Sequence, residues 1–370
     1  MPQSHATPQA PKRYLYGPGP TQVEDSVYQA MANNVVGHLD PYFFEVAGDV
    51  RARLRTVFGT SNELTLAISG TGSSGMETAV ANFVEPGVKF GVLSAGFFAE
   101  RIAEMARRHG ATVVKADKPW GETFSDAEAR EFILRERPQL VAFVHAETST
   151  GALQSPAAIC QAAHEVGALV IADTVTSLGA VPVEVDLHGI DIAYSCSQKG
   201  LSCPPGLSPV TVSPRAVERL DARKTPCDVW YLDLKLLRDY YDGKKYHHTA
   251  SATLMYALRE ALRLVDVEGA KIRWNRHRES HEYFVRKIEA MGLGMHVAPG
   301  HRIPNLNTVR TPEGVDDAKV RSRLLTEHGI EVAGGFGPLA GKIFRIGLMG
   351  PLATRDGVDF FLNAFQQCLK

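Results

Sequence analysis

The chain has 370 residues, of which 44% are hydrophobic and 22% charged, an ordinary balance for a globular protein large enough to form two domains. Its 40 basic and 41 acidic side chains give a net charge of -1, so nothing marks it as a nucleic-acid or membrane-surface binder. Its longest apolar runs, such as residues 140–144, are strand-sized and too short to span a bilayer.

The beginning of the chain and its cysteines indicate where the protein resides. Residues 1–12 are polar and proline-containing and lack the apolar core of a secretory signal, so we expect a mobile lead-in. The five cysteines are an odd count without metal-type spacing, which favours free thiols in a reducing compartment. The cytoplasm is therefore the expected location. These cysteines are Cys160, Cys196, Cys203, Cys227 and Cys368.

Short apolar runs alternate with helical patterns between residues 60 and 215, which predicts βα units around a mainly parallel sheet. Helices are expected at Ser74–Val84, where apolar residues share one face, and at Glu100–His109. Ser74 and Glu77 form a candidate capping box for the first of these helices. The expected strands are Leu64–Ile68, Phe90–Leu93, Thr112–Ala116, Leu140–Val144, Ala168–Ala172 and Ile192–Ser195.

After residue 250 the pattern changes to a long, charge-laced helical stretch over residues 251–290. The segments that follow are strand-like at Met295–Val297, Thr308–Val309 and Phe344–Ile346 and helical at Asp316–Glu327 and Arg355–Gln367. We therefore predict an α/β fold, with a mainly parallel sheet sandwiched by helices and a smaller α+β C-terminal domain. The expected limits are an N-terminal arm at 1–20, a large domain at 21–255 and a small domain at 256–370.

The segment 70–75 reads Gly-Thr-Gly-Ser-Ser-Gly and lies between a predicted strand and a predicted helix. Glycines let backbone amides close on an anion, and the start of a helix favours negative charge. The pattern also matches the glycine signature of dinucleotide-binding folds, which need an acidic residue at the end of the next strand. That strand ends at residues 92–96 without an acid, so the loop indicates a phosphate rather than a nicotinamide dinucleotide.

Asp173 stands at the end of one predicted strand, and Lys199 follows another. In an open parallel sheet both side chains and the glycine loop would meet at the carboxyl edge, where ligands bind. A phosphate cradle, a carboxylate and an amine are the groups that pyridoxal phosphate requires for its phosphate, its ring nitrogen and its aldehyde. Either residue alone is more often a helix cap or a surface charge, and their conjunction carries the prediction.

The sequence resembles the class V (fold-type I) pyridoxal-phosphate aminotransferases, specifically the alanine–glyoxylate and serine–glyoxylate group. The resemblance runs from residues 16–20 to the C-terminal helix, and its motifs lie at residues 71–73, 147–151, 171–177, 195–199, 246–249 and 341–347. It implies that Lys199 forms a Schiff base with pyridoxal 5'-phosphate and that Asp173 binds the pyridine nitrogen. Further implied cofactor-binding residues are Thr71, Gly72 and Ser73 at the phosphate, Gln198 beside it, and Thr148 at the 3′-oxygen.

The residue that stacks on the cofactor ring is commonly tryptophan in this family, and Phe98 occupies the matching position here. A phenyl ring can still stack, with less contact area, so we expect function to be kept and cofactor affinity to change. Phe97 takes this position if the alignment is displaced by one residue.

The resemblance also implies substrate and partner contacts. Arg345 would hold the substrate carboxylate, for which its forked guanidinium is suited, and Gly19 would lie at the substrate. Tyr246 and Thr249 would bind the phosphate of the neighbouring subunit's cofactor. A homodimer with active sites at its interface is therefore expected.

The implied reaction is transamination from a small amino acid, alanine or serine, to a small 2-oxo acid, with glyoxylate the expected acceptor. The alternatives are another pyridoxal-phosphate reaction, such as a ureidoglycine–glyoxylate transamination or a lyase reaction, a nicotinamide dehydrogenase, and a non-catalytic binding module. No metal is expected, because the spacing of His145, His247 and His248 matches no zinc pattern. Neither Cys196 nor Cys368 suits the mobile nucleophile of a desulfurase.

Overall fold

The computed structural model describes residues 9–370. The lead-in expected at residues 1–12 lies mostly outside this range, and residues 9–12 belong to no helix or strand. None of the helices within the described range is long and apolar enough to cross a membrane.

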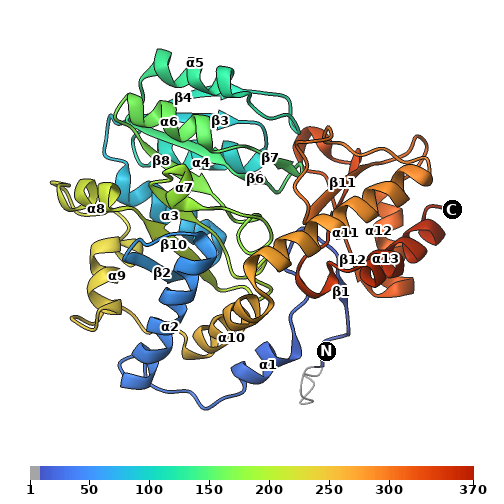
Figure 1. Ribbon diagram of the computed structural model, residues 1–370, viewed down its shortest axis with the longest axis horizontal. Coiled ribbons are helices and arrows are strands. Elements are labelled where there is room, and N and C mark those ends of the chain that lie inside the picture. The colour runs from blue at the N-terminus through green and yellow to red at the C-terminus, as the bar shows by residue number, and fades with distance from the viewer. Residues whose placement is uncertain (1–8) are drawn as a thin grey trace, which may run out of the picture.

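A seven-stranded sheet forms the centre of the larger part of the molecule (Figure 1). In spatial order its strands are β2 (Leu64–Ser69), β10 (Leu207–Val212), β9 (Ile192–Tyr194), β8 (Leu169–Asp173), β5 (Leu140–Val144), β3 (Lys89–Ser94) and β4 (Thr112–Asp117). All neighbours pair in parallel except β10, which runs antiparallel to β2 and β9. The mainly parallel sheet is thus confirmed, and β10 is a strand that the sequence patterns did not predict.

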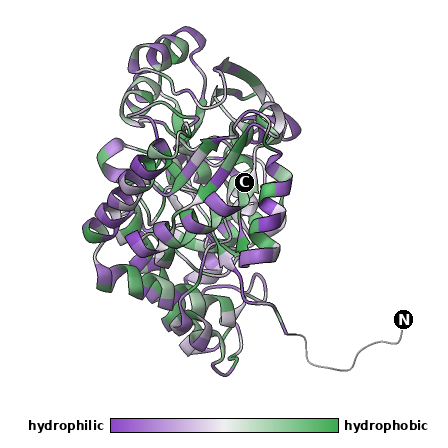
Figure 2. Ribbon diagram, turned by 90° about the vertical axis from the view of Figure 1, so that its right-hand side faces the viewer, coloured by the Kyte–Doolittle hydropathy of each residue, from purple (hydrophilic) through white to green (hydrophobic). Residues whose placement is uncertain are grey.

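Helices cover both faces of this sheet, which explains why its central strands are apolar throughout. The helices of the larger part are α1 (Asp25–Met31), α2 (Pro41–Phe58), α3 (Gly72–Phe83), α4 (Phe97–Arg108), α5 (Asp126–Glu136), α6 (Ala157–Glu165), α7 (Val185–His188), α8 (Pro214–Asp221), α9 (Leu234–Tyr241) and α10 (Ala252–Glu268). Many of these helices carry hydrophilic as well as hydrophobic residues, as expected for elements with one face on a core (Figure 2).

The helix α3 begins at Gly72 rather than at Ser74, and the expected capping box does not form. Thr71 is its N-cap residue, and the hydroxyl of Ser74 donates to the Thr71 carbonyl at 2.6 Å instead of capping the helix. The capping prediction was wrong because the glycine loop is shorter than the sequence pattern suggested, so Ser74 already lies inside the first helical turn.

The C-terminal part has a core of its own around a three-stranded antiparallel sheet of β11 (Leu306–Arg310), β14 (Ile343–Gly347) and β13 (Ala333–Gly334). Helices α11 (Ala270–Ala290), α12 (Asp317–His328) and α13 (Arg355–Cys368) accompany this sheet (Figure 1). The smaller C-terminal α+β domain is thus confirmed. The exact domain limits given above stay a prediction.

Two details of this part differ from the sequence-based expectation. The helical stretch over residues 251–290 is two helices, because Gly269 ends α10 with a positive φ of 83°. The segment Met295–Val297 is not a strand, since Met295 forms only an isolated bridge to Val309. At the other end of the chain, β1 (Tyr14–Leu15) pairs with β12 (Ile330–Glu331), which ties the N-terminal arm to the C-terminal domain.

Candidate active site

Two adjoining hollows lie between the carboxyl edge of the large sheet, the N-terminal arm and the C-terminal domain. The first has a volume of about 220 Å³ and the second about 310 Å³. Both are lined by Gly19, Pro20, Phe98 and Lys199. The predicted residues that line only the first are Thr71, Gly72, Ser73, Asp173 and Gln198, and those that line only the second are Thr148 and Arg345. One chain therefore brings together ten of the twelve predicted site residues.

The glycine loop turns from β2 into α3 at the first hollow. Gly70 has a φ of 141°, and a Cβ atom there would come within 2.5 Å of the Ser74 hydroxyl, so only glycine fits. The N-cap residue Thr71 makes no side-chain capping bond, so its hydroxyl is not used by the helix. The first backbone N–H groups of a helix lack intrahelical partners and attract anions. The loop therefore has the chemistry of a phosphate cradle.

Asp173 ends β8 and is 2% exposed. Its Oδ1 accepts a hydrogen bond from the Val175 backbone N–H at 2.9 Å, and its Oδ2 accepts one from the Tyr194 hydroxyl at 2.8 Å. Burial raises the pKa of Asp173 to about 7, and these two hydrogen bonds oppose the shift. A cationic ring nitrogen would favour the ionised carboxylate further.

Lys199 follows β9, and its side chain is buried. Its Nζ donates a hydrogen bond to the Pro18 carbonyl of the N-terminal arm. Burial lowers the pKa of Lys199, which favours the neutral amine, the form that can act as a nucleophile or a base. Gly19 has a φ of 115°, and a Cβ atom on it would meet Cδ of Lys199 at 2.9 Å, so the arm fits closely over the lysine.

Arg345 lies on β14 and faces the second hollow. Its Nε donates to the Gly334 carbonyl at 2.7 Å and its Nη1 donates to the Thr148 carbonyl at 3.1 Å. The guanidinium also lies 3.9 Å from the ring centre of Phe336, a cation–π contact. Burial lowers the pKa of Arg345 to about 10, so it stays charged at neutral pH. Further N–H groups of this fixed guanidinium are available to a carboxylate.

Phe98 lies in the first turn of α4 and lines both hollows, whereas Phe97 packs against Trp120 and Phe336. Phe98 is thus the phenyl group available to a ring bound beside Lys199. The guanidinium of Arg101 lies 4.8 Å from the Phe98 ring centre, and its Nη1 donates to the Ser73 hydroxyl at 3.2 Å.

Gln198 has a buried side-chain oxygen without a hydrogen-bond partner among residues 9–370. An unsatisfied buried polar atom is costly. Gln198 also lines the first hollow, so its side chain lies beside any ligand bound there.

Tyr246 and Thr249 do not line either hollow. Both residues lie outside the helices and strands, and both are exposed, Tyr246 by 61%. The chain by itself does not bring these two predicted residues to its own Lys199.

Three residues at the site were not singled out by sequence reasoning. They are Tyr194, which bonds Asp173, Arg101, which bonds Ser73, and Glu147, which accepts hydrogen bonds at the start of α4. The role of Tyr194 follows from its pairing with Asp173 across β8 and β9, and this register is not visible in one sequence. Glu147 stands beside Thr148 in the motif at residues 147–151.

The histidines weighed as metal ligands are engaged within the protein. Nδ1 of His145 bonds the Ser177 hydroxyl at 3.0 Å, and burial lowers the pKa of His145 to about 4. Nδ1 of His247 lies 2.9 Å from Nδ1 of His248, whose Nε2 bonds the Ser69 hydroxyl at 2.8 Å.

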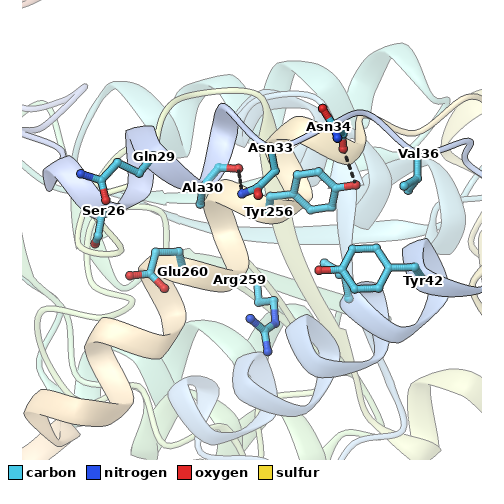
Figure 3. A pocket seen from close by; sticks show the side chains of 11 residues that line it. Ser26, Gln29, Ala30, Asn33, Asn34, Val36, Tyr42, Tyr256, Arg259 and Glu260 are labelled. Atoms are coloured by element: carbon cyan, nitrogen blue, oxygen red, sulfur yellow. Dashed lines mark hydrogen bonds between the residues drawn. The ribbon is translucent and has the colours of Figure 1, made fainter.

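A further hollow of about 530 Å³ lies away from Lys199, between α1, α2 and α10. Figure 3 shows Tyr42, Tyr256, Arg259 and Glu260 around it. None of the predicted catalytic or cofactor-binding residues lines this hollow. Its volume alone therefore does not make it the candidate active site.

Comparison with known proteins gives a consistent result over nearly the whole chain. The family model of aminotransferase class-V matches residues 13–358. Alanine–glyoxylate aminotransferase of Oryctolagus cuniculus is 37% identical over 97% of this chain and 93% of its own. The crystal structure of alanine–glyoxylate aminotransferase from Nostoc sp. is 48% identical with a TM-score of 0.98, over 100% of this chain and 98% of that one. The crystal structure of ureidoglycine–glyoxylate aminotransferase from Bacillus subtilis is 37% identical with a TM-score of 0.95, over 98% of this chain and 94% of that one.

Proposed function

The chain belongs to the class-V aminotransferases, enzymes that depend on pyridoxal phosphate, and we propose that it transfers an amino group from alanine or serine to glyoxylate. The observation that carries the proposal is the convergence of Lys199, Asp173 and Arg345 on two adjoining hollows. The names of the relatives supply glyoxylate as the acceptor.

The residues of the first hollow fit the cofactor. The phosphate would bind at Thr71, Gly72 and Ser73, where amides and hydroxyls are available. Asp173 would bind the ring nitrogen, and Phe98 would lie against the ring. Gln198 would contribute beside the phosphate, and Thr148, which lines the second hollow, would contact the 3′-oxygen. This assignment of residues is part of the proposal.

The cofactor, when bound, supplies an electron sink for the carbon from which a proton is removed. Lys199 would hold the cofactor through its amine. Once the amino donor has released it, Lys199 would accept the donor's Cα proton on Nζ and deliver that proton to C4′ of the cofactor. The lowered pKa of Lys199, caused first by burial, favours the neutral amine that this step requires. Arg345 would hold the donor carboxylate and thereby orient Cα toward Nζ.

The second hollow favours a substrate with a single carboxylate. Arg345 is the arginine that lines it, Lys199 is assigned to the cofactor, and the acidic residue Glu331 lines it as well. A second carboxylate on the substrate would therefore lack a cation and meet Glu331, so dicarboxylic donors are disfavoured. The similarity to ureidoglycine–glyoxylate aminotransferase makes ureidoglycine the alternative donor, and a lyase reaction on the same cofactor is a further alternative.

We further propose a homodimer in which Tyr246 and Thr249 reach the cofactor phosphate of the partner. Their exposure and their separation from the chain's own hollows support this arrangement. The cytoplasm is the proposed compartment, because all five cysteines are free.

A panel of donors tests the proposed reaction. Alanine, serine, ureidoglycine and aspartate are each incubated with the holoenzyme and glyoxylate, and the glycine formed is measured by chromatography. We expect glycine with alanine or serine and little with aspartate. Absence of glycine with every donor would contradict the proposed function, and glycine with ureidoglycine alone would favour the alternative donor.

A further inference from the structure

Glu147 is a buried carboxylate beside the active site. It ends the short strand β6 (Ala146–Glu147), immediately before Thr148, and is 4% exposed. Burying a carboxylate is costly unless hydrogen bonds satisfy it. Its partners therefore indicate why it is kept in this place.

The partners of Glu147 are hydrogen-bond donors of two segments. Oε2 accepts from the backbone N–H groups of Phe98 at 3.2 Å and Ala99 at 3.4 Å. Oε1 accepts from the Ser149 backbone N–H at 3.0 Å and from the Ser149 hydroxyl at 2.6 Å. The Ser149 hydroxyl in turn accepts from the Phe97 N–H at 3.0 Å.

These contacts replace the missing cap of α4. The N-cap residue Gly96 has no side chain, so it cannot bond the free N–H groups of the first turn. Glu147, which lies on another segment, accepts these bonds instead, and a negative charge is favoured at this end of a helix. The cap of α4 is thus also a connection between α4 and the strand that carries Thr148.

The connection is tightly packed at Gly96. A Cβ atom on Gly96 would lie 2.3 Å from Cγ and 2.4 Å from Cδ of Glu147. The φ of Gly96 is 178°, which any residue can adopt, so the close approach of Glu147 is the reason for glycine. The backbone of α4 and the carboxylate therefore hold each other in place.

Two groups of the active site depend on this connection. Phe98, whose N–H bonds Glu147, presents its ring to both hollows beside Lys199. Thr148, next to Glu147, accepts a hydrogen bond from Nη1 of Arg345 through its carbonyl. Burial lowers the pKa of Arg345, and the negative charge of Glu147 opposes this shift.

We propose that Glu147 is a positioning residue. Its buried carboxylate fixes the Phe98 ring against the cofactor and keeps that ring aligned with the Thr148–Arg345 pair. The inference rests on the proposed function insofar as Phe98 faces a bound pyridine ring. Glu147 lines neither hollow, so it would act through the start of α4 rather than by contact with the cofactor or the substrate. Removal of the carboxylate should therefore accelerate cofactor release more than it lowers the stability of the fold.

The test compares two identical chemical changes at two helix starts. Glu147→Gln replaces one carboxylate oxygen by an NH₂ group, which cannot accept the backbone N–H bonds. Asp316→Asn makes the same change at the start of α12, where Asp316 accepts from the Ala318 and Lys319 N–H groups. Each holoenzyme is transferred into buffer without cofactor, and its visible absorbance is followed with time, alongside its melting temperature and visible circular dichroism.

We expect Glu147→Gln to lose cofactor about tenfold faster than the wild type, with a weaker visible circular dichroism, because hydrogen bonds to a charged group are lost. Asp316→Asn should remain within about twofold of the wild type. Equal release from Glu147→Gln and wild type, or equally accelerated release from both variants, would overturn the proposal.

A second variant serves if Glu147→Gln does not fold. Ser149→Ala keeps the carboxylate and removes the hydroxyl that links it to Phe97, so release should be faster than in the wild type by a smaller factor, and unchanged release would overturn the proposal. The wild-type holoenzyme is also incubated with the donors named above. Failure of every donor together with accelerated release in Glu147→Gln would contradict transamination and leave the role of Glu147 standing.

Discussion

The hydroxyl of Tyr194 donates a hydrogen bond to Oδ2 of Asp173 at 2.8 Å, and both residues are buried. The two residues face each other because Asp173 and Tyr194 are register partners in β8 and β9. The Val175 N–H occupies the other carboxylate oxygen. The ionised form of Asp173 is thus supported from both sides against the pKa increase that burial causes.

Tyr194→Phe removes one of these donors, so the pKa of Asp173 should rise and its bond to the cofactor ring nitrogen should weaken. We expect kcat to fall about tenfold, with a smaller change in the KM for alanine, since a hydrogen bond to a charged group is lost. Steady-state kinetics measure both constants. Tyr241→Phe is the control, because the Tyr241 hydroxyl bonds the Ala67 carbonyl at 2.8 Å. A kcat for Tyr194→Phe equal to that of the control would speak against this role.

Arg345→Lys should impair binding of the amino donor more than turnover. Lysine keeps a positive charge and loses the planar fork that holds a carboxylate with two parallel hydrogen bonds. We expect the KM for alanine to rise about tenfold or more, with kcat reduced less. Arg323→Lys, in a surface ion pair with Glu327, should leave both constants unchanged. An unaltered KM for alanine in Arg345→Lys would show that another group holds the carboxylate.

His277 should contribute to the loss of stability in acid. Burial lowers its pKa from 6.5 to about 3, and its Nδ1 bonds the Arg273 carbonyl at 2.8 Å. Because the pKa of His277 is lower in the folded state, its contribution to the free energy of unfolding is complete above pH 6.5 and is lost as the pH falls toward 3.

The free energy of unfolding from urea titrations at pH 7 and pH 5 tests this account of His277. We expect the loss between the two pH values to be smaller in His277→Gln than in the wild type by about 2 kcal/mol. His301→Gln, at an exposed histidine, should lose as much as the wild type. An equal loss in His277→Gln and wild type would contradict the assignment.

Mixing two inactive variants tests the shared site. Lys199→Ala lacks the amine of one site, and Tyr246→Ala lacks the phosphate contact that we assign to the neighbouring site. A mixed dimer carries one site with both defects and one intact site, so activity should return on mixing, to at most about half the wild-type value per mixed dimer. Each variant refolded or incubated alone is the control. Lack of recovery, although mixed dimers form, would contradict a site built from two chains.

The architecture was largely predictable because its signals are local. The apolar strands Leu140–Val144 and Ala168–Ala172 lie between helices, and the structure has strands at both places. β10 escaped prediction because Pro209 interrupts its apolar pattern, and a proline argues against a central strand. Its position between β2 and β9 also depends on a long-range pairing. The break at Gly269 escaped because the helical pattern continues on both sides of it.

Lys199 and Asp173 could be proposed as site residues from residue type and position alone, whereas Arg345 entered only through the resemblance to a family. All three line the two hollows, and their roles stay predictions. A residue was not predictable where its place at the site comes from tertiary contact. Tyr194 becomes relevant only through its register with Asp173, and Glu147 only because α4 begins above it. Such residues resemble ordinary core or strand residues in a single sequence.

The visible absorption spectrum of the protein incubated with pyridoxal phosphate tests the central claim most directly. The account predicts a visible band that remains after removal of free cofactor, is abolished in Lys199→Ala, and is retained in Lys342→Ala, a variant at an exposed lysine. It also predicts that alanine or serine bleaches the wild-type band and that glyoxylate restores it. A wild-type protein that stays colourless, or a band unchanged in Lys199→Ala, would contradict the account.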